Sequence, residues 1–244
     1  LPTDPSNFQQ YIRTADIDGD GKLDILVGSS FSEIYRIFHN EGNLNFAPPV
    51  LMPGSWERLT DIETADLNSD AKPDVISVDV RAGKLFWHPN VDGTFPQQIL
   101  IAENLGTVST RIVCEDFNGD NKKDIVILNH FNALLFLNDG DGNFLPPTNI
   151  IPVEDETEFY DHVSGDFNGD GIMDLAITSS GFKVYINDGT GNFTENPGGG
   201  IIISLLIECA DYNNDGLDDI IMDGIHLVPY LNSPTGFTVV GQFS

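Results

Sequence analysis

Five short apolar runs recur along the chain, and each follows a polar, turn-forming loop. The runs are Ile25–Gly28, Val75–Val78, Ile125–Leu128, Leu175–Thr178 and Ile220–Met222, and the loops before them begin 50, 50, 50 and 45 residues apart. Apolar residues are nearly continuous in each run, which is typical of a short strand buried on both faces. The spacing therefore predicts five copies of one structural unit of about 50 residues.

Each copy contains further segments that favour strands. A second β-rich run ends in an Asn/Asp-Gly type of turn, which favours a hairpin; these runs are Glu33–Phe38, Lys84–Trp87, Ala133–Leu137, Phe182–Ile186 and Leu227–Leu231. An outer strand is then expected to begin at an aromatic residue: Phe46, Phe95, Phe144, Phe193 or Phe237. An inner strand leads into the next loop, and no segment has a sustained helical period.

Four-stranded units of this length, buried on both faces, suit blades that pack face to face around an axis. We predict an all-β fold, a five-bladed β-propeller of four-stranded antiparallel blades with a loop between the first and second strand of each. One domain over residues 1–244 is expected, with blades at approximately 8–52, 53–101, 102–151, 152–196 and 197–244. The ring would close by packing alone, or the chain would form part of a longer propeller. A β-sandwich is disfavoured because its strands would alternate.

Each loop places side-chain oxygen at positions 1, 3, 5 and 9 of nine residues. Calcium takes about six to eight oxygen ligands, and carboxylates this close repel one another unless a cation lies between them. We therefore predict about five structural Ca²⁺ ions, one in each loop. The expected side-chain ligands are Asp16, Asp18, Asp20 and Asp24; Asp66, Asn68, Asp70 and Asp74; Asp116, Asn118, Asp120 and Asp124; Asp166, Asn168, Asp170 and Asp174; and Asp211, Asn213, Asp215 and Asp219.

Position 7 of each loop would supply a backbone carbonyl, so its side chain is free to vary: Lys22, Lys72, Lys122, Ile172 and Leu217. Magnesium fits less well, because it prefers few carboxylates and several waters. An EF-hand is excluded, since it needs a glutamate at position 12 and flanking helices. Metal-free turns remain the alternative, most of all in the second loop, which has Ser69, Ala71 and Pro73.

The chain carries a formal net charge of −27, and 16 of its 38 acidic residues lie at the four oxygen-bearing loop positions. The acidity outside the loops argues against nucleic acid or anionic membranes as partners, since both need basic surface. No apolar run is long enough to cross a membrane. Loops that bind calcium weakly need calcium-rich surroundings, so we expect a secreted or extracellular protein, with the periplasm or cell surface as further possibilities. No signal peptide is visible.

Two cysteines and two histidines occupy positions that the repeat explains. Cys114 and Cys209 each lie two residues before the first aspartate of a loop. They belong to repeats that would not be neighbours, so we expect free thiols. His39 and His88 are interpreted as equivalent, partly buried residues, replaced by Leu137, Ile186 and Leu231 in the other repeats.

The D-x-[DN]-x-D-G-x-x-D loop, the apolar strand after it and the N-D-G-x-G-x-F turn resemble the FG-GAP/VCBS repeat family over nearly the whole chain. That family includes the β-propeller of integrin α chains and some propeller lectins. The resemblance implies a calcium-binding propeller. Integrin-type propellers have seven blades with calcium in only some, whereas this chain has five repeats with a loop in each.

Ligand binding is expected on the variable connections at the end of the blades opposite the loops. The candidate residues there are Trp56, Arg58, Arg81, His130, Phe131, Phe159 and Tyr160. Aromatic side chains beside polar groups suit sugars or peptides, so a glycan is the first expected partner and an extracellular protein the alternative.

Catalysis is not expected, because the sequence lacks the G-x-S-x-G, H-E-x-x-H and phosphate-loop motifs. One catalytic alternative remains, a pair of carboxylates near the axis that would act on a glycosidic bond. The carboxylates on or beside the inner strands are Asp61, Glu63, Glu115, Asp161 and Glu208.

Overall fold

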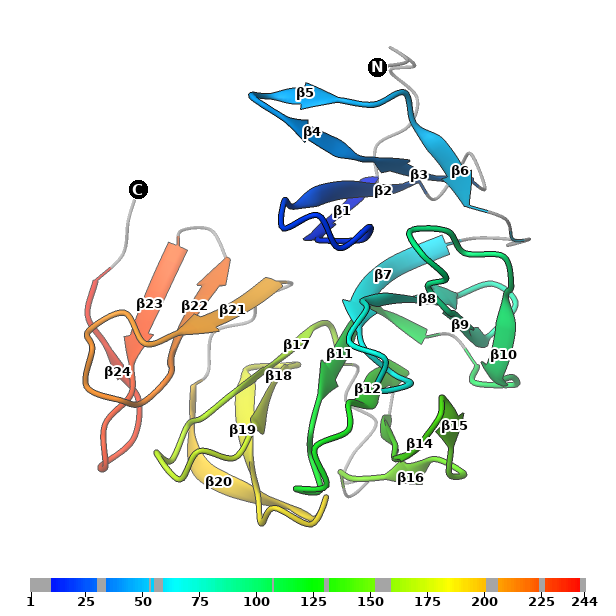
Figure 1. The fold of residues 1–244 in the computed structure, drawn as a ribbon. Coiled ribbons are helices and arrows are strands. Elements are labelled where there is room, and N and C mark those ends of the chain that lie inside the picture. Colours follow the sequence, from blue (N-terminus) through cyan, green and yellow to red (C-terminus); the bar gives the residue numbers. More distant parts are fainter. Residues whose placement is uncertain are drawn as a thin grey trace. The chain divides into compact units, whose positions relative to one another are not determined.

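The computed structural model describes residues 10–29, 34–52, 54, 59–106, 108–129, 132–151, 159–200, 206–223 and 227–241. Every regular element in these ranges is a β-strand, which confirms the all-β prediction for the described chain (Figure 1). The same ranges contain no helix that is long and apolar enough to cross a membrane. The chain divides into two compact units, residues 1–114 with 138–145 and residues 115–137 with 146–244.

The first unit contains two complete four-stranded antiparallel sheets, with strand orders β1-β2-β3-β6 and β7-β8-β9-β10. Their strands are β1 (Gln10–Ala15), β2 (Asp24–Ser29), β3 (Ile34–Phe38), β6 (Val50–Met52), β7 (Leu59–Ala65), β8 (Asp74–Asp79), β9 (Lys84–His88) and β10 (Ile99–Ala102). The hairpin of β4 (Asn40–Gly42) and β5 (Asn45–Phe46) extends the first sheet's turn. Nearly all of β11 (Val108–Glu115) and the hairpin of β14 (Asn138–Gly140) and β15 (Asn143–Phe144) also belong to this unit.

The second unit contains two more such sheets, with orders β17-β18-β19-β20 and β21-β22-β23-β24. Their strands are β17 (His162–Gly165), β18 (Asp174–Thr178), β19 (Phe182–Asn187), β20 (Phe193–Gly200), β21 (Leu206–Ala210), β22 (Asp219–Asp223), β23 (Leu227–Leu231) and β24 (Thr238–Val239). From the third repeat the unit holds β12 (Asp124–Asn129), β13 (Asn132–Phe136) and β16 (Thr148–Asn149), which pair in that order. Four-stranded antiparallel sheets of this kind match propeller blades.

The apolar runs form the most buried strands, as predicted. All residues of β8 and β18 are buried, and β12 is buried except at its last residue. Each unit has its own core: in the first, Ile17, Leu26 and Ile37 pack with Ile62 and Val75 from the next repeat. Strands from consecutive repeats therefore share one apolar layer, which explains why the runs do not alternate.

The prediction that an outer strand begins at the repeated aromatic residue holds for Phe193, which opens β20. It is wrong for Phe46 and Phe144, which lie in the short strands β5 and β15, while the outer strands β6 and β16 begin later. The reason is a two-residue turn with positive φ before each of them, which closes a separate hairpin first. Phe95 and Phe237 precede their outer strands.

The expected equivalence of His39 and His88 is wrong. His88 pairs with Val75, and the residues that pair at this position in the other repeats are Phe38, Phe136, Tyr185 and Tyr230. One residue separates this position from the asparagine of the turn in every repeat, and in the second repeat it is Pro89, so Pro89 is the counterpart of His39. His88 is fully buried, and its Nε2 lies 2.9 Å from Ser77 Oγ.

Both cysteines are free thiols, as expected, although each is only partly buried. The Cys209 thiol donates to the backbone carbonyl of Ser164 at 3.0 Å. A methyl group at Gly165 would lie 3.1 Å from Cys209 Sγ. The small side chains before each loop therefore allow neighbouring inner strands to approach closely.

Burial lowers the pKa of His88 to about 3, whereas an unfolded histidine titrates near ~6.5. The neutral ring therefore contributes its full stability above about pH 6.5, and this contribution is lost as the pH falls toward about 3. We expect His88→Phe, which introduces the ring found at the equivalent positions, to reduce the stability lost between pH 7 and pH 5 by about 2 kcal/mol. Urea unfolding at both pH values measures the difference. Loss of the hydrogen bond to Ser77 would lower the stability of the variant equally at both pH values, so it does not affect the comparison. If the wild type and His88→Phe lose the same stability between pH 7 and pH 5, the prediction is wrong.

Candidate metal loops and inter-repeat pockets

The five loops share one backbone conformation, built around the aspartate at position 1. In the first loop the N–H groups of Asp20 and Gly21 donate to the two carboxylate oxygens of Asp16, at 3.0 and 2.9 Å. The same pair of bonds recurs at Asp66, Asp116, Asp166 and Asp211. Positions 4 and 6 have positive φ in every loop, which explains the preference for glycine there. Ser69 and Ala71 adopt this conformation in the second loop.

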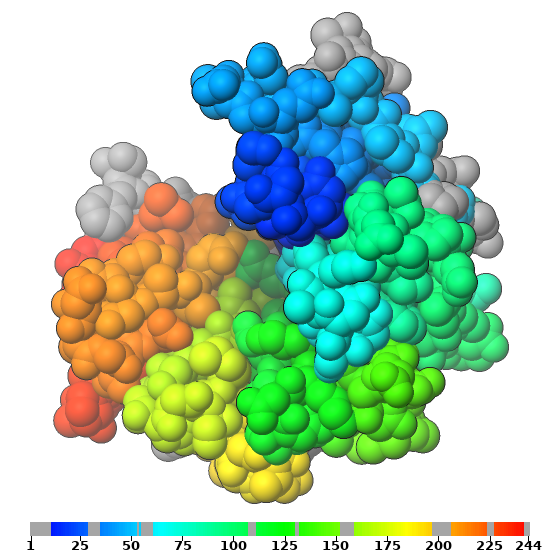
Figure 2. All heavy atoms as spheres, in the orientation of Figure 1, coloured from blue at the N-terminus to red at the C-terminus, as the bar shows by residue number. Residues whose placement is uncertain are grey.

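The side chains at positions 3 and 5 also accept backbone bonds that turn them toward the loop. Asp18 Oδ1 accepts from the N–H of Asp20 at 3.2 Å, and Asp20 Oδ1 accepts from the N–H of Lys22 at 2.9 Å. Oxygens of Asp16, Asp18 and Asp20 all lie within 4.8 Å of one another. The predicted oxygen cluster is thus assembled in the first loop, and in Figure 2 the dark-blue atoms of this stretch lie at the surface.

The aspartate at position 9 is fully buried in all five repeats. One of its oxygens accepts from the N–H of loop position 2, at 3.0–3.1 Å. The other accepts from the N–H of the asparagine that opens the hairpin turn, at 2.8 Å for Asn40, Asn90 and Asn187 and 2.7 Å for Asn232. This residue therefore joins the loop to the turn, a role that sequence reasoning, which treated it as a metal ligand, did not foresee.

The chemistry of the loops fits a hard divalent cation. Burial raises the pKa of Asp74 and of Asp174 to about 6, although backbone N–H groups oppose the shift. A nearby positive charge would favour the ionised carboxylates. Lysine supplies some of that charge in the first loop, where Lys22 pairs with Asp20. The fourth and fifth loops have Ile172 and Leu217 at the same position, so a lysine at this position cannot provide it there.

An asparagine side chain joins consecutive repeats within each unit. In four repeats the asparagine that opens the hairpin turn donates from Nδ2 to the backbone carbonyl of loop position 2 in the preceding repeat. The pairs are Asn90 to Ile17 (2.8 Å), Asn138 to Leu67 (2.8 Å), Asn187 to Phe117 (2.9 Å) and Asn232 to Phe167 (2.8 Å). These asparagines are only 1–4% exposed. The sequence signal for this joint was the asparagine repeated in all five turns, which was interpreted only as a turn former.

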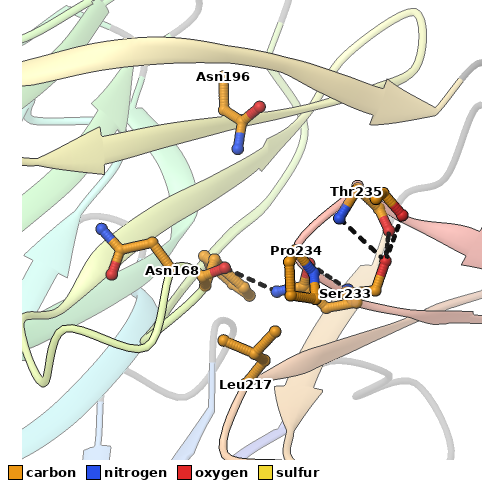
Figure 3. A pocket seen from close by; sticks show the side chains of 9 residues that line it. Asn168, Asn196, Leu217, Ser233, Pro234 and Thr235 are labelled. Carbon is orange, nitrogen blue, oxygen red and sulfur yellow. Dashed lines mark hydrogen bonds between the residues drawn. The ribbon is translucent and has the colours of Figure 1, made fainter.

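A pocket of about 550 Å³ lies beside the joint between the fourth and fifth repeats. Figure 3 shows Asn196 on one side of it and Leu217 opposite, with Asn168 across from the Ser233–Thr235 turn and its amide pointing away from that turn. A second pocket, of about 480 Å³, lies at the equivalent joint of the first and second repeats, where Asp18 and Lys72 take the places of Asn168 and Leu217. The crevice between a loop and the next turn is therefore a repeated feature.

Three of the seven residues predicted to bind a ligand lie within the described chain. Trp56, Arg58, His130 and Phe131 lie outside the described residues. Arg81 is exposed in the first unit, whereas Phe159 and Tyr160 belong to the second. Phe159 packs against a buried cluster that includes Leu128 and Ile177. The two pockets described above lie beside the loops, and binding at the variable connections stays a prediction.

The inner-strand carboxylates have structural partners. Asp61 and Asp161 are each 2% exposed and accept a backbone N–H from the next inner strand, from Ile112 at 2.8 Å and Ile207 at 3.2 Å. Burial raises the pKa of Asp61 to about 7, although Arg13, which pairs with both Asp61 and Glu63, opposes the shift. Lys123 pairs with Glu115 at 2.7 Å. Asp61 and Asp161 therefore connect inner strands, the same task that the asparagines perform at the turns.

Comparison with known proteins agrees with this architecture. A family model described as FG-GAP-like repeat matches residues 16–77, 66–127, 116–177 and 166–222. No curated protein matches the sequence. Among solved structures, an Agrocybe aegerita lectin that recognises non-reducing terminal N-acetylglucosamine superposes with a TM-score of 0.73 at 20% identity, over 96% of this chain and 65% of its own. The chain thus spans about two thirds of that lectin.

Two larger chains also match in structure. The Photorhabdus luminescens Tc holotoxin pore matches with a TM-score of 0.53 at 18% identity, over 98% of this chain and 12% of its own. The V. cholerae biofilm matrix protein Bap1 matches with a TM-score of 0.50 at 18% identity, over 83% of this chain and 30% of its own. At these identities the likeness establishes the fold alone.

Removing a joint asparagine should destabilise the protein strongly. Asn187 donates to Phe117 and Met173 and accepts from Gly189, so Asn187→Ala deletes three bonds at a buried site. We expect a loss of about 3 kcal/mol, because each bond contributes about 1 kcal/mol and buried carbonyls lose their donors. Asn192→Ala is the control, since Asn192 is exposed in the same turn. Equal costs for the two variants in urea unfolding would contradict the role of the joint.

Proposed function

The chain belongs to the FG-GAP-like repeat family, and from this premise we propose that it is a calcium-stabilised β-propeller module of five blades that binds carbohydrate. The observation that carries the proposal is the pair of pockets at equivalent inter-repeat joints, each beside a loop of clustered oxygens. We further propose that the module is secreted or extracellular, because sites of this kind need about 0.1–1 mM calcium.

Calcium is supported by the donor set. Only oxygen is offered at positions 1, 3 and 5, and the side chains are already turned together by backbone bonds. Asp16, Asp18 and Asp20 would hold the ion in the first loop, and the equivalent residues would do so in the others. The ion would supply positive charge that lets several close carboxylates remain ionised, and would thereby stabilise the loop that carries the joint.

Carbohydrate is supported by the lining of the pocket between the fourth and fifth repeats. Asn196 and Thr235 offer amide and hydroxyl groups that can pair with sugar hydroxyls, while Leu217 and Pro234 offer apolar contact for a sugar ring. A small set of placed polar groups in a partly apolar cleft is the usual composition of a small-molecule site. The similar lectin recognises terminal N-acetylglucosamine, so this sugar is the first ligand to test. Repetition of the crevice would raise avidity for clustered glycans.

Removal of calcium should lower the melting temperature. At about 1 mM calcium and a Kd of about 0.1 mM, each site adds about 1.4 kcal/mol, so five sites add about 7 kcal/mol. For a chain of this size that corresponds to a shift of at least about 10 °C. Differential scanning calorimetry with calcium, with EDTA, and with EDTA plus excess magnesium measures the shift. A change below about 3 °C would mean that the loops are turns without a structural ion.

Glycan binding should depend on the pocket beside the joint. We expect a glycan array in calcium to identify terminal N-acetylglucosamine structures, and Asn196→Ala and Thr235→Ala to weaken binding at least about 10-fold, since each removes a bond worth about 1.4 kcal/mol. Arg81→Ala, in a variable connection, is the control and should leave affinity unchanged. Loss of binding in Arg81→Ala alone would move the site to the variable connections. An array with no binding by the folded, calcium-loaded protein would favour the alternative of an extracellular protein partner.

A further inference from the structure

The first repeat differs from the other four at two positions, and the two altered side chains face each other. Loop position 3 is an aspartate in the first repeat, Asp18, and an asparagine in every other repeat. The residue before the turn asparagine is His39, and its counterparts are Pro89, Leu137, Ile186 and Leu231. His39 Nδ1 lies 3.5 Å from Asp18 Oδ2. Two separate departures from the repeat therefore place an imidazole beside an added carboxylate.

The buried aspartate at loop position 9 completes a group of three. His39 Nδ1 lies 3.2 Å from Asp24 Oδ2, and one possible ligand atom of each of Asp18, Asp24 and His39 lies within 4.8 Å of the other two. Asp24 Oδ2 accepts the N–H of Ile17 at 3.0 Å. A carboxylate oxygen has two lone pairs, so this oxygen can accept the N–H and still ligate a metal.

The spacing of these atoms fits a small tetrahedral ion. Zinc binds nitrogen and carboxylate oxygen at about 2.0–2.2 Å, which places the ligand atoms of a tetrahedron about 3.3–3.6 Å apart. The two distances from His39 Nδ1 to the carboxylate oxygens, 3.2 and 3.5 Å, are close to this value. Three protein ligands leave the fourth position to water. Asp18 also lines the pocket of about 480 Å³, which gives an ion access to it from solvent.

The donor set separates this group from the calcium loop that it adjoins. Calcium takes oxygen ligands, whereas imidazole nitrogen suits zinc and neighbouring transition metals. Asp18 contributes to both groups through different atoms: its Oδ1 accepts the N–H of Asp20 inside the loop at 3.2 Å, and its Oδ2 faces His39. An ion held by His39 therefore has a different chemistry from the ions proposed for the five loops.

We propose that Asp18, Asp24 and His39 bind one Zn²⁺ ion in the first repeat, in addition to the calcium proposed for its loop. The ligands come from the loop, from the first residue of β2 and from the residue after β3, so the ion ties these three segments together. The proposal does not depend on the sugar ligand or on calcium. Its alternative is a histidine that only hydrogen-bonds to the two carboxylates without a metal.

Isothermal titration calorimetry tests the site in the whole chain. Protein treated with EDTA and dialysed into about 1 mM calcium should bind one equivalent of zinc. His39→Leu and Asp18→Asn each introduce a residue that other repeats have at the same position, so both variants should fold. Each should weaken zinc binding at least about 10-fold, since loss of even a group that only orients a metal ligand costs about 10–100-fold. No saturable zinc binding, or binding that both variants leave unchanged, overturns the proposal.

The third repeat offers a place to rebuild the site. A methyl group at Gly191 would lie 3.8 Å from Leu137 Cδ2, just as one at Gly93 would lie 3.9 Å from His39 Cε1, so the next turn passes both positions at a similar distance. Asn118→Asp/Leu137→His should therefore raise the zinc stoichiometry from one to two. A folded double variant that still binds a single equivalent contradicts the ligand assignment.

Cobalt identifies the ligand atoms. Co²⁺ bound in place of zinc should give the visible absorption of a tetrahedral ion, and His39→Leu should abolish it. A thiolate charge-transfer band in the near ultraviolet would place the metal on Cys114 or Cys209 and overturn the proposal. His39→Leu should keep the melting shift caused by calcium, so failure of the zinc site and failure of the calcium proposal are read from separate measurements.

Discussion

Each repeat depends on one buried carboxylate, the aspartate at loop position 9. Its two oxygens accept one N–H from the loop and one from the hairpin turn, and so fix the distance between two polar segments that follow different strands. Burying an ionisable group is costly unless it is bonded, and these backbone donors satisfy it. The turn asparagine held in this way extends its amide to the preceding repeat. The same residue therefore positions the loop, the turn and the joint.

The joint explains why consecutive repeats can share a core without a continuous sheet. Apolar packing between strands such as β2 and β7 supplies most of the favourable burial, but it is not directional. A buried amide that must find one carbonyl fixes the angle between the sheets, because leaving it unpaired would be costly. Asp61 and Asp161 do the same for the inner strands. Two sets of directional hydrogen bonds thus fix the relative orientation of neighbouring sheets, which apolar packing alone would not fix.

The location of the pockets follows from the joint. The asparagine holds the turn of one repeat beside the loop of the preceding one, and loop and turn residues line the space left between them in both pockets. Any ion that stabilises the loops would also stabilise these walls. A binding site at this position couples ligand recognition to the rigidity of the loops, whereas a site on the variable connections would not.

The sequence by itself determined the repeat, the β-strands and the oxygen-bearing loops, because hydrophobic periodicity and turn chemistry are local properties. Even the positive φ at loop positions 4 and 6 was implied by the glycines there. Strand register was not determined: His88 occupies the position of an aromatic ring, and His39 the position of Pro89, and the strand pairing reveals both. The tertiary structure also decided the role of Asn90 and its counterparts, and the place of the pockets. These depend on contacts between residues about 70 positions apart, such as Asn90 and Ile17, and no local pattern records which distant carbonyl a buried amide must reach.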